Sequence, residues 1–229
     1  MSAQITQVES VRDAEQLSAF LNSVWSDGSE VAPFDLIVAA IHVGAYAVIA
    51  KQGEQIAGGS FGFVGRFNEQ VILHSHVTAA TVAGVGFIIK QHQKLWAAQQ
   101  GISAITWTFD PLVRRNCVFN FEKLGATAVE YLPNFYGAMT DSINAGDESD
   151  RLFAYWPTDL GAKLENPSGK KIEIALPADI ETLRKQDLAG ALEWRRQIRE
   201  ILQPAFSIGA TIHSMTEDRT AIVLNTPEA

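Results

Sequence analysis

The sequence predicts a mixed α/β fold, with helices on both faces of a central sheet and a carboxy-terminal α+β extension. Two observations predict it. Between Val71 and Gly125, β-rich apolar runs alternate with runs that carry apolar residues at helical spacing, as in a strand–helix–strand crossover. Upstream, the Gln52–Glu54 turn separates two apolar runs in the manner of a hairpin. Antiparallel hairpin strands around a parallel β-α-β core make a mixed sheet.

Composition excludes several classes of protein. The chain has 229 residues, of which 47% are hydrophobic, so it can bury a sizeable core in one large domain or two small ones. A net charge of −8 argues against a nonspecific nucleic-acid partner. The single cysteine, Cys117, excludes an intramolecular disulfide and suggests no zinc site, so we expect no metal. Since neither a signal-peptide pattern nor a long apolar run is present, we expect a soluble, cytoplasmic protein without a membrane partner.

The amino-terminal part is expected to hold a strand, two helices and a hairpin. Apolar residues line one helical face of Val11–Trp25. Pro33 stands where a helix can begin and Gly44 where one ends. In order, the elements are a strand Ile5–Val8, helices Val11–Trp25 and Phe34–Val43, strands Tyr46–Ala50 and Gln55–Val64, and a turn Gly65–Gln70. Glycines inside the second hairpin strand predict close packing, a bulge or the approach of a ligand.

The central stretch predicts an anion site. Its elements are a strand Val71–Val77, a small-residue turn Thr78–Gly86, a helix Phe87–Gly101, a strand Ile102–Phe109 and a short helix Cys117–Leu124. A strand, a glycine turn and the amino end of a helix direct free N–H groups and the helix dipole at one place.

The last part is expected to close the sheet and then to form the extension. The predicted elements are a strand Thr127–Leu132, a charged break Asp147–Arg151, a strand Leu152–Trp156, a polar linker-like run 162–171, a strand Lys171–Leu176, a helix opened by Leu176–Asp187, a charged helix Ala189–Leu202, and a hairpin of Ala205–His213 with Arg219–Asn225. We therefore predict two domains, residues 1–160 and 161–229.

The order of elements resembles the GNAT acyltransferase superfamily, named for its N-acetyltransferases, over roughly the first two thirds of the chain. That superfamily binds the coenzyme A pyrophosphate at a Gln/Arg-x-x-Gly-x-Gly/Ala turn before a helix. Here the corresponding run is Thr81-Val82-Ala83-Gly84-Val85-Gly86, with Thr81 in place of the Gln or Arg. The resemblance implies a GNAT-like acyltransferase domain over 1–160 and acetyl-CoA as co-substrate.

A branch of predicted GNAT proteins resembles more of the chain, including its final third. The matching residues are Ser75-His76, Trp107 to Leu112, Arg115-Asn116, Phe119-Asn120, Lys123 to Gly125, Tyr136-Gly137, Ser149 to Arg151, Leu176 to Asp179, and Trp194-Arg195 with Arg199-Glu200. Two departures stand out. The turn before Gly84 lacks the usual Pro and Arg-Gly run, and Phe121 replaces a tyrosine that protonates the leaving thiolate in such enzymes.

The resemblance implies a coenzyme site around the glycine turn. The backbone of Val77, Thr78 and Ala79 would pair with the pantetheine amides as an added strand does. Thr81, Gly84, Val85 and Gly86 would surround the pyrophosphate, and Asn116 and Phe119 would lie near the pantetheine. The alternative for the turn is a tight strand-to-helix connection, and Asn116 can equally cap the helix that starts at Cys117.

Candidate catalytic residues are His76, Asp110 and Tyr136. His74 and His76 fall on one side of a strand, and an imidazole suits a general base for an amine; the alternative is a packed, hydrogen-bonded pair. Asp110 can anchor an acceptor or act as a base, or it can cap the turn after Pro111. Tyr136, like Tyr131, can supply the proton that Phe121 lacks, or it is a half-buried packing residue.

Charged and thiol side chains have simpler alternatives. Arg114 and Arg115 can reach a phosphate or solvate a loop. The cluster of Arg195, Arg196 and Arg199 is expected to form a solvated or salt-bridged helix face, or else to recognise an acidic acceptor or another subunit. A nucleophilic role for Cys117 is not expected, because no histidine is placed beside it.

The sequence thus predicts an acyl-CoA-dependent N-acyltransferase that moves acetyl from acetyl-CoA to a small amine by direct attack. The alternative is a catalytically inactive GNAT-like protein that binds a ligand or a partner. A homodimer is left open.

Overall fold

The computed structural model describes residues 3–25, 30–137, 146–159, 161–162, 164–165 and 167–228. Contacts divide the chain into two compact units. Unit 1 contains Met1–Thr106 and Thr158–Ala162, and unit 2 contains Trp107–Pro157 and Lys163–Ala229. Compact units are not the same as domains, so the predicted domains 1–160 and 161–229 stay a prediction.

Unit 1 is built on a mixed sheet, as the sequence predicted. Its strands are β1 (Gln4–Gln7), β2 (Tyr46–Gln52), β3 (Gln55–Phe67), β4 (Gln70–Ala80) and the beginning of β5 (Ala104–Phe109), and its helices are α1 (Val11–Trp25), α2 (Phe34–His42) and α3 (Val85–Gln99). Neighbours from β1 to β4 pair antiparallel, whereas β4 and β5 pair parallel. The crossover through α3 supplies this parallel pair.

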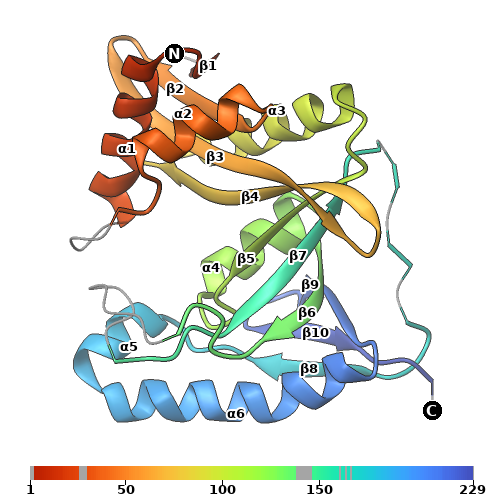
Figure 1. Cartoon of the computed structure of the whole chain (residues 1–229). Helices are drawn as coiled ribbons and strands as arrows, with labels where there is room; N and C mark the ends of the chain where they lie inside the picture. The colour runs from red at the N-terminus through yellow and green to blue at the C-terminus, as the bar shows by residue number, and fades with distance from the viewer. Residues whose placement is uncertain are drawn as a thin grey trace. The chain divides into compact units, whose positions relative to one another are not determined.

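Helices cover both faces of the unit 1 sheet, and glycines of β3 let them approach (Figure 1). A Cβ on Gly58 would stand 2.7 Å from Val85 Cγ1 of α3, and one on Gly59 would stand 2.5 Å from Leu17 Cδ1 of α1. Because neighbouring strand residues point to opposite faces, α1 and α3 lie on opposite sides of β3. Leu17 belongs to a buried apolar cluster that also contains Phe61 and Val77. Close packing is therefore one reason for the glycine-rich run.

Gly62 is required by the neighbouring backbone. A Cβ there would lie 2.7 Å from the carbonyl oxygen of His74 and 3.2 Å from Ser75 Cα, and backbone atoms cannot move aside. We expect Gly62→Ala to lower the free energy of unfolding by about 1–3 kcal/mol, as overpacking does. The matched control is Gly65→Ala on the same strand, whose Cβ would meet only Ile72 Cδ1 at 3.7 Å. Denaturant unfolding measures both variants, and equal midpoints would contradict the prediction.

Unit 2 holds an antiparallel sheet and its own helices. The strands, in spatial order, are β7 (Arg151–Pro157), β6 (Thr127–Leu132), β9 (Thr211–Met215), β10 (Ala221–Asn225) and β8 (Lys171–Ala175). The helices are α4 (Arg114–Cys117), the π-helix η1 (Val118–Lys123), α5 (Ile180–Gln186) and α6 (Leu188–Ser207). Asp179 and Asp187 cap α5 and α6, because their carboxylates accept from the amides of Thr182 and Gly190.

Several predicted boundaries were wrong for local reasons. The turn after β3 is only two residues, Asn68 and Glu69, both with positive φ, so β3 runs three residues beyond Val64. β4 continues to Ala80, and α3 begins at Val85 rather than Phe87, because Gly84 ends the turn at φ 84°. The predicted strand from Ala205 begins only at Thr211, since α6 continues to Ser207.

Candidate functional site

The turn from β4 into α3 leaves amide groups free at the start of the helix. Gly84 precedes α3 in the left-handed conformation, and among the described residues no side chain caps the helix. The amide of Val85 donates to the carbonyl of Val82 at 3.2 Å. For the amides of Gly86 and Phe87, no acceptor is found in the part of the chain that the structure describes. Two free N–H groups and the positive end of the helix dipole therefore face the solvent at one point, as an anion site requires.

The strand that leads into this turn has one unpaired edge. β4 and β5 pair from Ile72↔Ala104 to His74↔Thr106. Beyond His74, β4 continues to Ala80 with β3 as its partner among the described strands. Backbone groups on the other edge are therefore available to an extended molecule that carries amides.

A β-bulge lies where that unpaired edge begins. Phe61 pairs with Val77 and Phe63 with His74, so one residue of β3, Gly62, faces both Ser75 and His76 of β4. Such a bulge bends the strand and re-aims its side chains. Ser75 contacts α3, whereas His76 points to the opposite face, the one that α1 covers.

The two histidines of β4 share an aromatic partner but differ in environment. The exposed ring of Phe63 lies 5.3 Å from the His74 ring and 6.0 Å from the His76 ring. His74 Nδ1 forms a 3.0 Å hydrogen bond with Thr106 Oγ1. Burial, with contributions from His76 and Lys90, lowers the pKa of His74 to about 4, so His74 is neutral near pH 7 and a weak base.

His76 has the arrangement that a general base needs. It is exposed, and its Nε2 lies 3.3 Å from the carbonyl oxygen of Val31. A carbonyl oxygen only accepts hydrogen bonds, so Nε2 carries the proton of the neutral imidazole. Nδ1 then holds the free lone pair.

Polar side chains fill the space between α3 and the sheet, and sequence reasoning missed them. Lys90 is only 5% exposed, and its Nζ donates to Ser75 Oγ at 2.8 Å and to Gln93 Oε1 at 3.2 Å. Thr78 Oγ1 joins this group at 2.8 Å from Ser60 Oγ and 3.5 Å from Ser75 Oγ. The sequence did indicate buried polar groups here, because Lys90 and Gln93 lie on the same face of α3 as the apolar residue Ala97.

In unit 2, Asp110 lies in a buried ion-pair network. Its carboxylate accepts two hydrogen bonds from Arg195, at 2.9 and 2.8 Å, and one from Arg184 at 2.6 Å. Both arginines also bind the buried carboxylate of Asp147. Burial alone would raise the pKa of Asp110, but the charges of Arg195, Arg184 and Arg151 hold it well below its ordinary value.

This network bears on two predictions. Asp110 also accepts from the amide of Leu112, which is the turn-capping alternative, and its catalytic role stays a prediction. The predicted charged break Asp147–Arg151 holds buried charges, since Asp147, Asp150 and Arg151 are all buried.

The two candidate tyrosines differ in what their hydroxyls contact. Tyr131 is buried and donates to Asp150, and burial together with Asp150 raises the pKa of Tyr131. It therefore holds its proton too tightly for a general acid. Tyr136 is 46% exposed, and its hydroxyl lies 2.9 Å from Thr108 Oγ1. Phe121 is buried against Phe109, and its phenyl ring has no proton to give.

The other predicted residues of unit 2 lie on or near α4 and η1. Asn116 and Phe119 are half-buried, and Asn116 is the third residue of α4 instead of its cap. Cys117 is buried, donates to the carbonyl of Pro111 and has a raised pKa caused first by burial, so it is not a nucleophile.

The arginines mostly bind within unit 2. Arg114 donates to the carbonyl of Leu176, and Arg115 pairs with Glu181. The sequence predicted a solvated or salt-bridged face for Arg195, Arg196 and Arg199. Arg195 is salt-bridged to Asp110 and Asp147, but it is buried at 2% exposed instead of lying on the surface. Arg196 pairs with Glu193 and Glu200 on the surface, and Arg199 pairs with Asp150 and Glu148.

Acetyltransferases are among the solved structures with a similar fold. A GNAT-family acetyltransferase from Streptococcus pneumoniae matches with a TM-score of 0.54 at 18% identity, over 68% of this chain and 99% of its own. The ribosomal-protein-S18-alanine N-acetyltransferase from Escherichia coli matches with 0.53 at 12%, over 71% and 98%. A GNAT-family acetyltransferase from Elizabethkingia anophelis with acetyl-CoA bound matches with 0.52 at 13%, over 68% and 98%. The chain has the GNAT fold. No family model and no curated protein matches its sequence.

The GNAT fold accounts for most, but not all, of the chain. The neighbours are covered almost completely, whereas about three tenths of this chain has no counterpart in them. Among the described residues, no helix is long and apolar enough to span a membrane.

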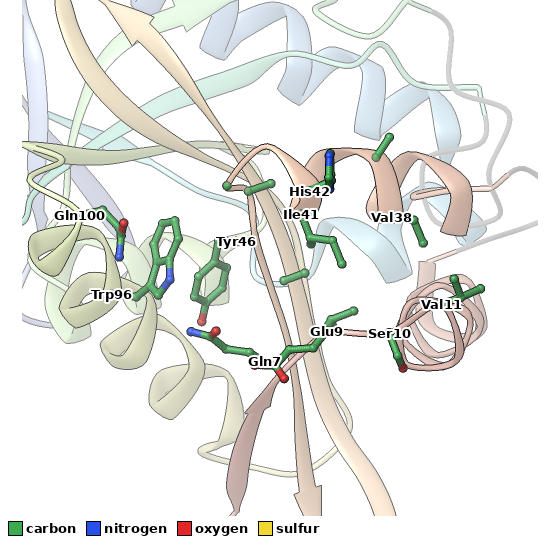
Figure 2. A pocket seen from close by; sticks show the side chains of 15 residues that line it. Gln7, Glu9, Ser10, Val11, Val38, Ile41, His42, Tyr46, Trp96 and Gln100 are labelled. Carbon is green, nitrogen blue, oxygen red and sulfur yellow. The ribbon is translucent and has the colours of Figure 1, made fainter.

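A surface groove of unit 1 contains none of the predicted site residues. It holds about 780 Å³ and is lined by residues of β1, α2, β2 and α3 and their connections. Figure 2 shows Tyr46 and Trp96 side by side in it, near Gln7 and Gln100. The Tyr46 hydroxyl already bonds to His92 Nδ1 at 2.9 Å. The GNAT-fold site proposed from the sequence therefore does not coincide with this groove.

Proposed function

We propose that this protein is an acyl-CoA-dependent N-acyltransferase that moves the acetyl group of acetyl-CoA to a small amine. The observation that carries the proposal is the uncapped start of α3 directly after the half-paired strand β4. An anion site at the end of an open strand edge suits a phosphorylated molecule with an amide-containing arm. Support also comes from the fold neighbour that was solved with acetyl-CoA bound.

In this proposal, the backbone of the chain binds the coenzyme. The amides of Gly86 and Phe87 receive the pyrophosphate, and Thr81, Gly84 and Val85 shape the turn around it. The open edge of Val77–Ala79 pairs with the two amides of the pantetheine arm. Asn116 and Phe119 stay predictions as pantetheine contacts.

The acyl transfer needs positioning and one base. The neutral amine attacks the thioester carbon, a C–N bond forms, and the C–S bond breaks with its electron pair on sulfur. Nδ1 of His76 takes the proton that the attacking nitrogen releases. Tyr136 stays a prediction as the proton donor to the thiolate. The small-molecule acceptor and the cytoplasmic location also stay predictions.

Binding of acetyl-CoA tests the proposal, and Gly86→Leu tests the anion site. A Cβ on Gly86 would meet only Ala80 Cβ at 3.7 Å, and leucine favours a helix, so the fold should remain stable. A bulky side chain over the free amides should weaken binding about 10–100-fold, the cost of losing charged hydrogen bonds. Isothermal titration measures the affinity, with Ala98→Leu at the exposed far end of α3 as the control.

Each result has a clear meaning. Unchanged affinity of Gly86→Leu would remove the assignment of the pyrophosphate to this turn. No binding by the unaltered protein would overturn the proposed function. Thiol release with a panel of amines then separates an enzyme from a protein that only binds the coenzyme.

A further inference from the structure

The bulge of β4 separates two sets of polar groups onto opposite faces of the strand. His76 lies on the α1 face, with its Nε2 on the Val31 carbonyl. Ser75 lies on the α3 face and accepts from Lys90 Nζ at 2.8 Å. Lys90 is buried between α3 and the sheet among the polar side chains of Ser75 and Gln93, and burying a charge there is costly unless it is hydrogen-bonded.

Lys90 lies near the place where the sulfur of the coenzyme would be bound. This inference rests on the proposed function. With the pyrophosphate at Gly86, a pantetheine arm that follows the open edge of β4 runs backwards from Ala80. That edge closes at His74, where the pairing with β5 starts, so the thioester end reaches the bulge at Ser75 and His76. Lys90 contacts the strand at this same place.

We infer that Lys90, acting through Ser75, stabilises the negative charge that develops on the coenzyme sulfur when the acyl group leaves. The groups on the two faces of the bulge then have different roles in the reaction. His76 takes the proton of the amine on one face, and the Lys90 ammonium offsets the thiolate charge from the other. Lys90 is a positioning residue, because it acts through the Ser75 hydroxyl, to which its Nζ donates.

Three physical features suit Lys90 to this role. Lys90 is buried, so a charge on it acts on nearby charge more strongly than it would in solvent. Ser75 Oγ accepts from Lys90, which leaves the hydroxyl proton of Ser75 for another acceptor. Burial lowers the pKa of Lys90 to about 7, so a neighbouring thiolate can restore the charged form by its attraction.

The role also bears on the absence of a tyrosine at position 121. Phe121 cannot protonate a thiolate and Tyr131 is bound to Asp150, so Tyr136 is the remaining predicted donor. Stabilising the thiolate by a buried charge lowers the need for a proton donor at the moment of C–S cleavage. The thiolate takes up a proton later, from Lys90 or from water, and the amine proton leaves through His76.

The test compares the binding of free coenzyme A with that of its desulfo analogue. The experiment needs no acceptor amine, since both are ligands without an acyl group. It is done at about pH 8, between the pKa of Lys90 and that of a free thiol, about 8.5. At this pH, His74 is neutral. A pKa shift of about 2–3 units, the upper part of the range that an opposite charge causes, means that the unaltered protein should prefer coenzyme A over desulfo-coenzyme A on the order of threefold to twentyfold.

Lys90→Met keeps the length and apolar stem of the side chain but removes the charge. We expect Lys90→Met to bind coenzyme A and desulfo-coenzyme A with affinities within about twofold of each other. Its affinity for desulfo-coenzyme A should equal that of the unaltered protein. If Lys90 had only a structural role, the substitution would weaken the binding of both ligands equally. If Lys90→Met does not fold, Lys90→Gln serves in its place.

Three outcomes overturn the inference: no preference for the sulfur in the unaltered protein, an undiminished preference in Lys90→Met, and an equal loss for both ligands. Failure of the proposed function looks different, because then the unaltered protein binds neither coenzyme A nor its desulfo analogue.

Discussion

Replacing Arg195 by Met is expected to lower the free energy of unfolding by about 3–5 kcal/mol, because it leaves a buried charge without its partner. Arg195 donates to both Asp110 and Asp147, and all three side chains are buried. With Arg184 the network holds two positive and two negative charges. The variant keeps two neighbouring carboxylates and only one arginine. Denaturant unfolding measures the effect.

The control for this prediction stands next to it on the same helix. Arg196 is exposed and pairs only with Glu193 and Glu200 of α6. Surface pairs of this kind contribute little, so Arg196→Met should change the free energy of unfolding by less than about 1 kcal/mol. If the two variants lose equal stability, the network at Asp110 does not stabilise unit 2 as we argue.

The same network predicts how stability depends on pH. The pKa of Asp110 is lower in the folded protein than its ordinary value of 3.8. A lowered folded pKa contributes stability that is fully present above the unfolded pKa and is lost as pH falls. Stability of the unaltered protein should therefore decline below about pH 4, and Arg195→Met should reduce that decline because it removes the main charge that lowers the pKa.

The sequence predicted the parts of the fold that local patterns determine. The apolar stripe of Val11–Trp25 gave both ends of α1, because the residues around it are polar or turn-forming. Gly84 marked the turn before α3, since the left-handed conformation there strongly favours glycine. The mixed sheet followed from the order of the elements.

The sequence could not show features that depend on distant residues. Asp147 lies 48 positions from Arg195, and no local pattern pairs them. Arg195 did carry a signal, because it shares the buried face of α6 with Ala191, Ile198 and Leu202. A polar residue at an apolar position of a helix predicts a buried partner but does not name it.

The bulge is the clearest case of such a feature. It exists because one residue of β3 faces two of β4, and the register of two strands cannot be read from either strand alone. Alternation along β4 placed His74 and His76 on one side, but it did not show that Phe63 contacts both or that Ser75 reaches Lys90.

Replacing His76 by Ala is expected to reduce kcat by about 10²–10⁴-fold for any amine that the unaltered protein acylates, the usual contribution of a general base. The geometry carries this expectation. Nε2 of His76 lies 3.3 Å from the Val31 carbonyl, so Nδ1 is the basic atom, and the side chain is exposed beside the open edge of β4. The affinity for acetyl-CoA should stay within about twofold, because the backbone binds the coenzyme in this proposal.

The control for this prediction is His42 on α2, which also lies on the surface. His42→Ala should keep the full rate. Should His76→Ala retain its full rate, the amine proton must leave by another route, and a water chain to the solvent becomes the acceptor to test.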